Sequence, residues 1–141
     1  MQRQVPEPVL AAFNVAGWTY CIDFDYMGGL SKKLNMSCIG ATNYSQKTIY
    51  LSDASATLHE FGHFLDWRLG FPVEHEHLYL AEAQNSGLRD YAKTNAIEYF
   101  ADCFDYWITY SADKKRMDDF RDAAPQTYAY MKKLAANNWG A

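Results

Sequence analysis

The sequence predicts an α+β protein in which a small antiparallel or mixed sheet comes first and a helical half follows. Three segments rich in aromatic and β-branched residues lie early in the chain, at positions 18–24, 38–44 and 47–51. From Ser55 onward, apolar residues recur every three or four positions, which is the spacing of helices packed on a core. With 141 residues, 49% of them hydrophobic, the chain is predicted to form one domain over residues 1–141.

The first half is expected to contain one short helix besides the strands. Pro8 suits the first turn of a helix, and the helix that it opens is predicted to stop near Gly17. Positions 43–46 have the composition of a turn, so the last two strands are predicted to pair in antiparallel fashion. The segment 26–37 contains two glycines and is predicted to be a loop.

The second half is predicted to be helical apart from its connections. A helix over 58–69 is expected to end at Gly70, a residue type that favours helix termination. The segment 71–90 follows no clear pattern. Ser111 is predicted to cap a polar helix that reaches Arg121. The two remaining predicted helices cover positions 95–110 and 125–134.

Composition and charge argue against several classes of protein. The 13 basic and 17 acidic residues give a net charge of −4 without a basic stripe, so nucleic acid is not an expected partner. No apolar run approaches the roughly 18 residues of a membrane span, so no membrane association is expected. The three cysteines, Cys21, Cys38 and Cys103, leave at least one free thiol. Residues 1–8 lack the features of a signal peptide, which favours a cytoplasmic protein over a secreted one.

The segment His59-Glu-Phe-Gly-His63 matches the pattern H-E-x-x-H inside a helix that apolar spacing predicts independently. Residues four apart on a helix differ by about 40° around the axis and roughly 6 Å along it, so both imidazoles can reach one metal ion. Glu60 projects to the neighbouring flank, where it can hold a water molecule. Neutral imidazoles suit Zn²⁺, which lowers the pKa of a bound water to about 7. The alternative is a solvated helix face that binds no metal.

A catalytic zinc site needs a third protein ligand and one open position. The metzincin pattern requires Gly at position 66 and His at position 69, but the chain has Asp66 and Leu69, which excludes that class. The remaining candidates are acidic residues and histidines further along the chain. They are Glu74, His75, Glu76, His77, Glu82, Asp90 and Glu98. The cluster at 74–77 follows the end of the helix closely and is better explained as an exposed polar loop.

Glu98 is the preferred third ligand because it lies in a second amphipathic helix. Asp102 is one turn further along the same helix face. One carboxylate can then bind the metal while the other orients a ligand imidazole through its free N–H. The alternative is an ordinary solvated edge of a helix.

Two stretches resemble the catalytic domain of the anthrax lethal factor-like zinc metallopeptidases, a group that includes the Pro-Pro endopeptidases. They are Ala56-Thr-Leu-His-Glu-Phe-Gly-His-Phe-Leu-Asp66 and Asn95-Ala-Ile-Glu-Tyr-Phe-Ala-Asp102. The resemblance implies that His59, His63 and Glu98 bind Zn²⁺ and that Glu60 is the general base. It also implies that Tyr91, seven residues before the ligand glutamate, assists the oxyanion.

The residues and the resemblance together imply a minimal zinc endopeptidase of the gluzincin type, with Zn²⁺ as its cofactor. A peptide or protein substrate is expected to lie extended along an edge strand, and the strand at 47–51 has this role if it lies at the edge of the sheet. The alternative is a zinc-binding regulatory or inactive homologue that acts through protein–protein interaction.

Overall fold

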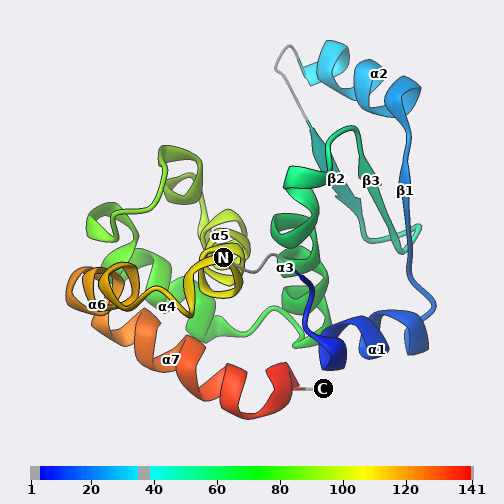
Figure 1. Cartoon of the computed structure of the whole chain (residues 1–141). Helices are drawn as coiled ribbons and strands as arrows, with labels where there is room; N and C mark the ends of the chain where they lie inside the picture. Colours follow the sequence, from blue (N-terminus) through cyan, green and yellow to red (C-terminus); the bar gives the residue numbers. More distant parts are fainter. Residues whose placement is uncertain (1–3, 35–38, 141) are drawn as a thin grey trace.

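The computed structural model describes residues 4–34 and 39–140 and confirms the α+β fold (Figure 1). The α-helices in these ranges are α1 Glu7–Val15, α2 Phe24–Leu34, α3 Thr57–Arg68, α4 Val73–Glu82, α5 Ala96–Tyr110, α6 Lys114–Ala123 and α7 Pro125–Ala136. The strands are β1 Thr19–Ile22, β2 Gly40–Asn43 and β3 Thr48–Leu51. Helix α3 lies between the sheet on one side and α5 on the other, with α4, α6 and α7 beyond α5. None of the described helices is long and apolar enough to cross a membrane.

The sheet has β3 at its centre, in the strand order β1-β3-β2. β3 pairs antiparallel with β2, which confirms the predicted hairpin, and parallel with β1. The prediction that 47–51 could serve as an edge strand is therefore wrong, because β1 pairs with the side of β3 that β2 leaves free. A parallel pair needs a crossover connection, and α2 lies in the segment that makes it. The edges of the sheet are β1 and β2.

The prediction of a loop at 26–37 is wrong over the described part of this segment, because α2 occupies these positions up to Leu34. A side-chain oxygen of Asp23 accepts a hydrogen bond from the N–H of Tyr26 at 2.8 Å and so caps the first turn. Met27 is buried, and the ring of Tyr26 stacks on that of Tyr50 in β3 with 3.8 Å between centroids. Packing against the sheet thus stabilises a helix that its two glycines disfavour.

Two predicted elements, the strand at 38–44 and the loop at 26–37, lie partly outside the described residues. The strand is observed as β2 over its described part. Cys38 and positions 35–37 lie outside the described ranges. Cys21 is exposed and Cys103 is buried, and both are free thiols, in line with the expectation of at least one.

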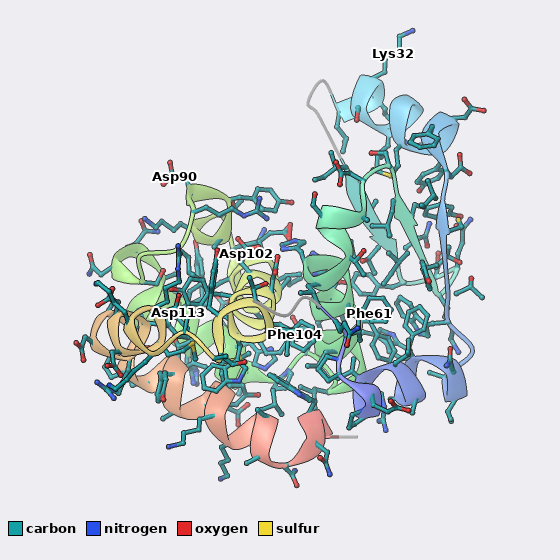
Figure 2. The ribbon with its side chains drawn as sticks, in the orientation of Figure 1. Lys32, Phe61, Asp90, Asp102, Phe104 and Asp113 are labelled. Carbon is teal, nitrogen blue, oxygen red and sulfur yellow. The ribbon has the colours of Figure 1, made fainter. Side chains whose placement is uncertain are left out.

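Helix α3 is the core helix of the molecule, and every residue from Leu58 to Asp66 is buried. On its sheet side, Phe61 packs on Phe13 of α1 with 4.6 Å between ring centroids, and Phe64 packs edge-on against Trp18 at 5.2 Å. Figure 2 shows Phe61 on the side of α3 that faces away from α5. The helix predicted at 58–69 is confirmed.

The helical half follows the prediction at α5 and α7 and differs elsewhere. The unassigned segment 71–90 contains α4. Asp113, and not Ser111, caps α6, because its carboxylate accepts the N–H of Arg116. Glu82, one of the candidate metal ligands, caps α7 instead. Its carboxylate accepts the backbone N–H groups of Gln126 and Thr127 and the Thr127 hydroxyl, at 2.9, 2.7 and 2.7 Å.

His75 ties three helices together from the first turn of α4. Its Nδ1 lies 2.8 Å from Oδ1 of Asp66 in α3, and its Nε2 lies 2.7 Å from the hydroxyl of Tyr130 in α7. The imidazole also stacks on Phe100 of α5 with 4.0 Å between ring centroids. The prediction of an exposed polar loop at 74–77 is therefore wrong for the backbone and for His75. Glu74, Glu76 and His77 are exposed as expected.

We expect His75→Ala to destabilise the fold without affecting metal binding. It leaves the buried Asp66 carboxylate without its imidazole partner, which costs roughly 1–3 kcal/mol besides the lost stacking on Phe100. His77→Ala, two residues along on the exposed side of α4, is the matched control and should unfold at the parent urea concentration. Both variants should hold zinc as the parent does, and a loss of zinc from either one would place the third ligand in α4.

Candidate metal centre

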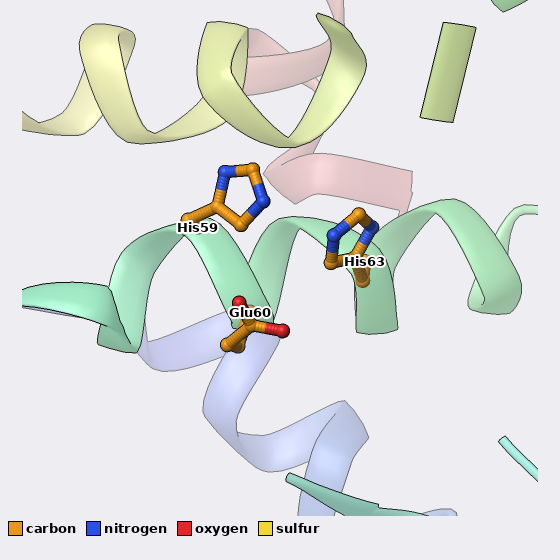
Figure 3. Close-up of side chains that lie close together, drawn as sticks. All are labelled: His59, Glu60 and His63. Carbon is orange, nitrogen blue, oxygen red and sulfur yellow. The ribbon is translucent and has the colours of Figure 1, made fainter. Parts of the chain in front are cut away.

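Helix α3 presents two imidazoles on the side that faces α5. His59 and His63 lie one turn apart with 4.7 Å between ring centroids, and the two residues are 5% and 7% exposed. Figure 3 shows both rings rising from the same side of α3, with the Glu60 carboxylate on the adjacent flank. The spacing inferred from the motif is thus realised on a rigid, buried helix.

Close contact between α3 and α5 brings a carboxylate within reach of these histidines. A Cβ atom at Gly62, between the two histidines, would lie 2.7 Å from the Cα of Ala101 in α5. Such a distance is not compatible with normal packing, so the two helices approach this closely only because Gly62 has no side chain. Gly62 therefore determines how far α5 stands from the histidines.

Glu98 is the acidic residue of α5 that contacts both imidazoles. Its Oε1 lies 3.0 Å from Nε2 of His59 and 2.8 Å from Nε2 of His63. The position of Glu98 is determined locally by Asn95, whose side-chain oxygen accepts the Glu98 N–H at the start of the helix. Two nitrogens and one oxygen thus converge on one point between the helices.

This donor set fits Zn²⁺. Tetrahedral ligands at about 2.0–2.1 Å from zinc lie about 3.3 Å from one another, close to the observed separations. Without a metal, burial lowers the pKa of His59, but hydrogen bonds to Asp102 and Glu98 outweigh burial and raise it to about 9. The hydrogen bonds from His59 and His63 likewise outweigh burial and lower the pKa of Glu98. A metal ion bound here therefore competes with a proton on His59.

Asp102 holds the far side of the His59 ring. Its Oδ1 lies 2.6 Å from Nδ1 of His59, so the ionised carboxylate accepts this N–H and orients the ring with Nε2 toward Glu98. Although burial raises the pKa of Asp102, hydrogen bonds from His59 and Arg89 lower it overall. Arg89 donates from Nε to Oδ2 at 2.6 Å and from Nη2 to Oδ1 at 2.9 Å.

Tyr91 lies beside His59, with 5.7 Å between ring centroids, in the short 3₁₀ helix η3 at Asp90–Lys93. Its hydroxyl donates to Oε2 of Glu98 at 2.6 Å, on the oxygen that does not face the imidazoles. Burial, followed by this hydrogen bond, raises the pKa of Tyr91, so the hydroxyl keeps its proton. The side chain is 40% exposed, so it lies where the centre opens to solvent.

Glu60 lies next to the convergence point and contacts strand β2. One of its carboxylate oxygens is within 4.8 Å of a nitrogen of each histidine, further away than the Glu98 oxygen. The hydroxyl of Thr42 in β2 donates to Oε1 of Glu60 at 2.9 Å. A Cβ at Gly40 would lie 2.9 Å from Oε2 and Cγ of the same side chain. In β2, therefore, Gly40 leaves room for the Glu60 side chain and Thr42 fixes its carboxylate by a hydrogen bond.

The structure thus brings all six predicted site residues together between α3, α5 and η3. Their chemical roles remain predictions. Sequence reasoning missed three residues that contact them: Gly40, Thr42 and Arg89. No sequence motif marks these residues, because each meets its partner through a contact between segments that are distant in the sequence. The other candidate ligands lie apart: Asp90 is exposed and bridges to Lys93 at 3.9 Å, while His75 and Glu82 have the structural partners described above.

Comparison with protein families gives a match over most of the chain. Residues 24–134 match the family described as anthrax toxin lethal factor, N- and C-terminal domain. This range includes all the residues that converge on the candidate centre. A search of curated proteins finds no match.

We expect Gly62→Ala to weaken zinc binding and to destabilise the fold. The added methyl group would meet the backbone of Ala101, so α5 must move away and carry Glu98 with it. Gly29→Ala in α2 is the matched control, since a Cβ there meets nothing within 4 Å and should stabilise its helix by about 1 kcal/mol. Chelator competition and urea unfolding measure both effects. Parent-like zinc affinity in Gly62→Ala would show that the helix separation does not control the ligands.

Proposed function

The chain belongs to the anthrax toxin lethal factor family, a family of zinc metalloproteases, and from this membership we propose that it is a zinc-dependent endopeptidase of the gluzincin type. One observation carries the proposal: Nε2 of His59, Nε2 of His63 and Oε1 of Glu98 converge on one point, with the carboxylate of Glu60 beside it.

His59, His63 and Glu98 would hold the ion. A zinc ion bound by this set supplies a Lewis acid, which polarises a carbonyl group and lowers the pKa of water to about 7. The third ligand, Glu98, would contribute one negative charge, and the Glu60 carboxylate lies beside the donors. Asp102 keeps the Nδ1 proton on His59, so that Nε2 offers its lone pair to the ion.

Glu60 acts as the general base in this proposal. It takes a proton from the attacking water and transfers it to the nitrogen of the leaving amine. The hydrogen bond from Thr42 occupies Oε1, which leaves Oε2 to accept the proton. Because Glu60 is 5% exposed and lies on a helix, its carboxylate is held in place before the substrate arrives.

Tyr91 supplies a proton donor for the oxyanion that develops on the scissile carbonyl. In the structure its hydroxyl donates to Glu98, so its action in catalysis requires rotation of this exposed side chain toward the substrate. The raised pKa keeps the phenol protonated and able to donate.

A peptide substrate would lie extended along β2. This strand is an edge of the sheet, pairs with β3 on one side only and contacts α3 through Glu60. An extended peptide can add to such an edge by main-chain hydrogen bonds, which brings its carbonyl groups past the base. β2 therefore replaces 47–51 as the proposed substrate strand. The net charge of −4 favours a cationic segment as substrate, and the 16% content of aromatic residues favours an apolar one.

A zinc-binding regulatory protein is the alternative function. Such a protein needs the ligands but has no use for a positioned base. The support that Thr42 and Gly40 give to Glu60 therefore favours the peptidase.

The first test is metal content together with Glu60→Gln. The parent should retain about one zinc ion per chain after dialysis and cleave a peptide library in a chelator-sensitive manner. Glu60→Gln keeps the shape of the side chain but cannot accept the proton, so it should bind zinc normally while hydrolysis falls by about 10²–10⁴-fold. A parent without zinc would contradict both functions. Parent-like hydrolysis by Glu60→Gln would rule out the role of the base.

Tyr91→Phe tests the oxyanion donor. It keeps the ring and removes the hydroxyl, and the loss of one such donor typically lowers kcat by about 10²–10³-fold. We expect zinc affinity and melting temperature close to those of the parent, with a smaller effect on KM than on kcat. Weaker zinc binding at unchanged kcat would instead assign Tyr91 to holding Glu98, and no change in either would remove it from the site.

A further inference from the structure

We propose that Arg89 is a positioning residue of the metal centre, which fixes the Asp102 carboxylate and through it the orientation of His59. The inference rests on the proposed zinc site and adds a residue that neither the motif nor the sequence pattern indicates. Arg89 lies between η2 (Ala83–Asn85) and η3, two residues before Tyr91. It reaches across to Asp102 on α5, which Figure 2 labels between η3 and α3.

The contact between Arg89 and Asp102 involves both carboxylate oxygens. Nε donates to Oδ2 at 2.6 Å while Nη2 donates to Oδ1 at 2.9 Å. Oδ1 is the oxygen that accepts the Nδ1 proton of His59 at 2.6 Å. A bidentate guanidinium prevents rotation of the carboxylate, since a planar pair of donors matches only one carboxylate plane. The direction of the hydrogen bond to His59 is therefore determined by Arg89.

The guanidinium is itself held on a second side. Its central carbon lies 5.0 Å from the centroid of the Tyr91 ring, within the range of a cation–π contact. The ring and the carboxylate together restrict the guanidinium to one orientation. Because Tyr91 and Arg89 are close in the chain, this contact also fixes the short segment that carries both side chains toward α5.

The solvent exposure of Arg89 favours a positioning role over a role in stabilising the fold. The Arg89 side chain is 61% exposed, whereas that of Asp102 is 7% exposed. Arg89 lines a surface cavity of about 240 Å³ behind the metal centre, so its outer side meets solvent. Water screens the exposed guanidinium, and the Asp102 carboxylate keeps its hydrogen bond from His59 when Arg89 is replaced. The contact therefore affects the geometry of Asp102 and His59 more than the stability of the fold.

Arg116 provides a matched control in the same cavity. It is also an exposed arginine that lines this cavity, but its guanidinium lies over the Tyr110 ring at 4.3 Å and pairs with Asp113 at 3.4 Å. Replacing it removes the same charge from the same cavity. Its contacts do not involve Asp102.

The experiment measures zinc affinity by chelator competition in the parent and in Arg89→Met, Arg89→Lys and Arg116→Met. Loss of a group that orients a ligand imidazole typically weakens metal binding by about 10–100-fold, which we expect for Arg89→Met. Arg89→Lys keeps the charge but not the pair of donors, so it should lose affinity by an intermediate factor. Arg116→Met should bind zinc like the parent. Urea unfolding of the metal-free variants should differ little from that of the parent.

A double-mutant cycle shows whether Arg89 acts through Asp102. In an Asp102→Asn background, adding Arg89→Met should weaken zinc binding by less than about threefold, because the carboxylate that Arg89 orients is already gone. Losses that simply add would contradict the proposal, as would equal losses in Arg89→Met and Arg116→Met.

The outcomes separate this inference from the proposed function. Parent-like affinity in Arg89→Met overturns the inference and leaves the zinc site intact. A parent that binds no zinc overturns both. If Arg89→Met does not fold, Arg89→Lys decides, since it keeps a cation beside the buried Asp102 carboxylate. Parent-like zinc affinity in Arg89→Lys would then overturn the proposal.

Discussion

The close approach of α3 and α5 at Gly62 is the constraint on which the candidate centre depends. A side chain at this position would meet the backbone of Ala101, and the helices could not pack at the observed distance. At that distance one oxygen of Glu98 reaches both His59 and His63. The same packing buries Asp102 beside His59. Helix separation thus determines whether the donors converge.

Around this contact the charged groups compensate one another. The buried carboxylate of Asp102 and the partly buried carboxylate of Glu98 face two imidazoles, an arrangement that would be costly without further partners. Arg89 from the segment before η3 and the hydroxyl of Tyr91 supply these partners, one for Asp102 and one for Glu98. Glu98 turns one oxygen toward the histidines and the other toward Tyr91. Both oxygens of Asp102 accept from Arg89, and one of them also accepts from His59. The short segment that carries Arg89 and Tyr91 thus contacts both carboxylates.

The sheet contributes through its edge rather than its centre. β2 lies against α3, where Thr42 donates to the Glu60 carboxylate and Gly40, on the same side of the strand, leaves room for it. The proposed base and the proposed substrate strand are therefore in direct contact. A peptide that adds to β2 would come close to Glu60 without any movement of α3. On the other side of the centre, His75 joins α3 to α4 and α7 and keeps the helical half in place.

The sequence by itself determined the α+β class, the positions of α3 and α5, and the candidate residues on them, since helical periodicity and the H-E-x-x-H spacing are local properties. Tertiary structure decided what depends on contacts between distant segments. Contact with the sheet made a helix of the described part of the loop predicted at 26–37, and the parallel pairing of β1 put β3 at the centre of the sheet. His75 became a buried link because α7 supplies Tyr130, and Arg89 reached Asp102 because the chain folds back over α5. No local sequence pattern predicts these contacts, because each joins residues that are distant in the sequence and meet only in the folded structure.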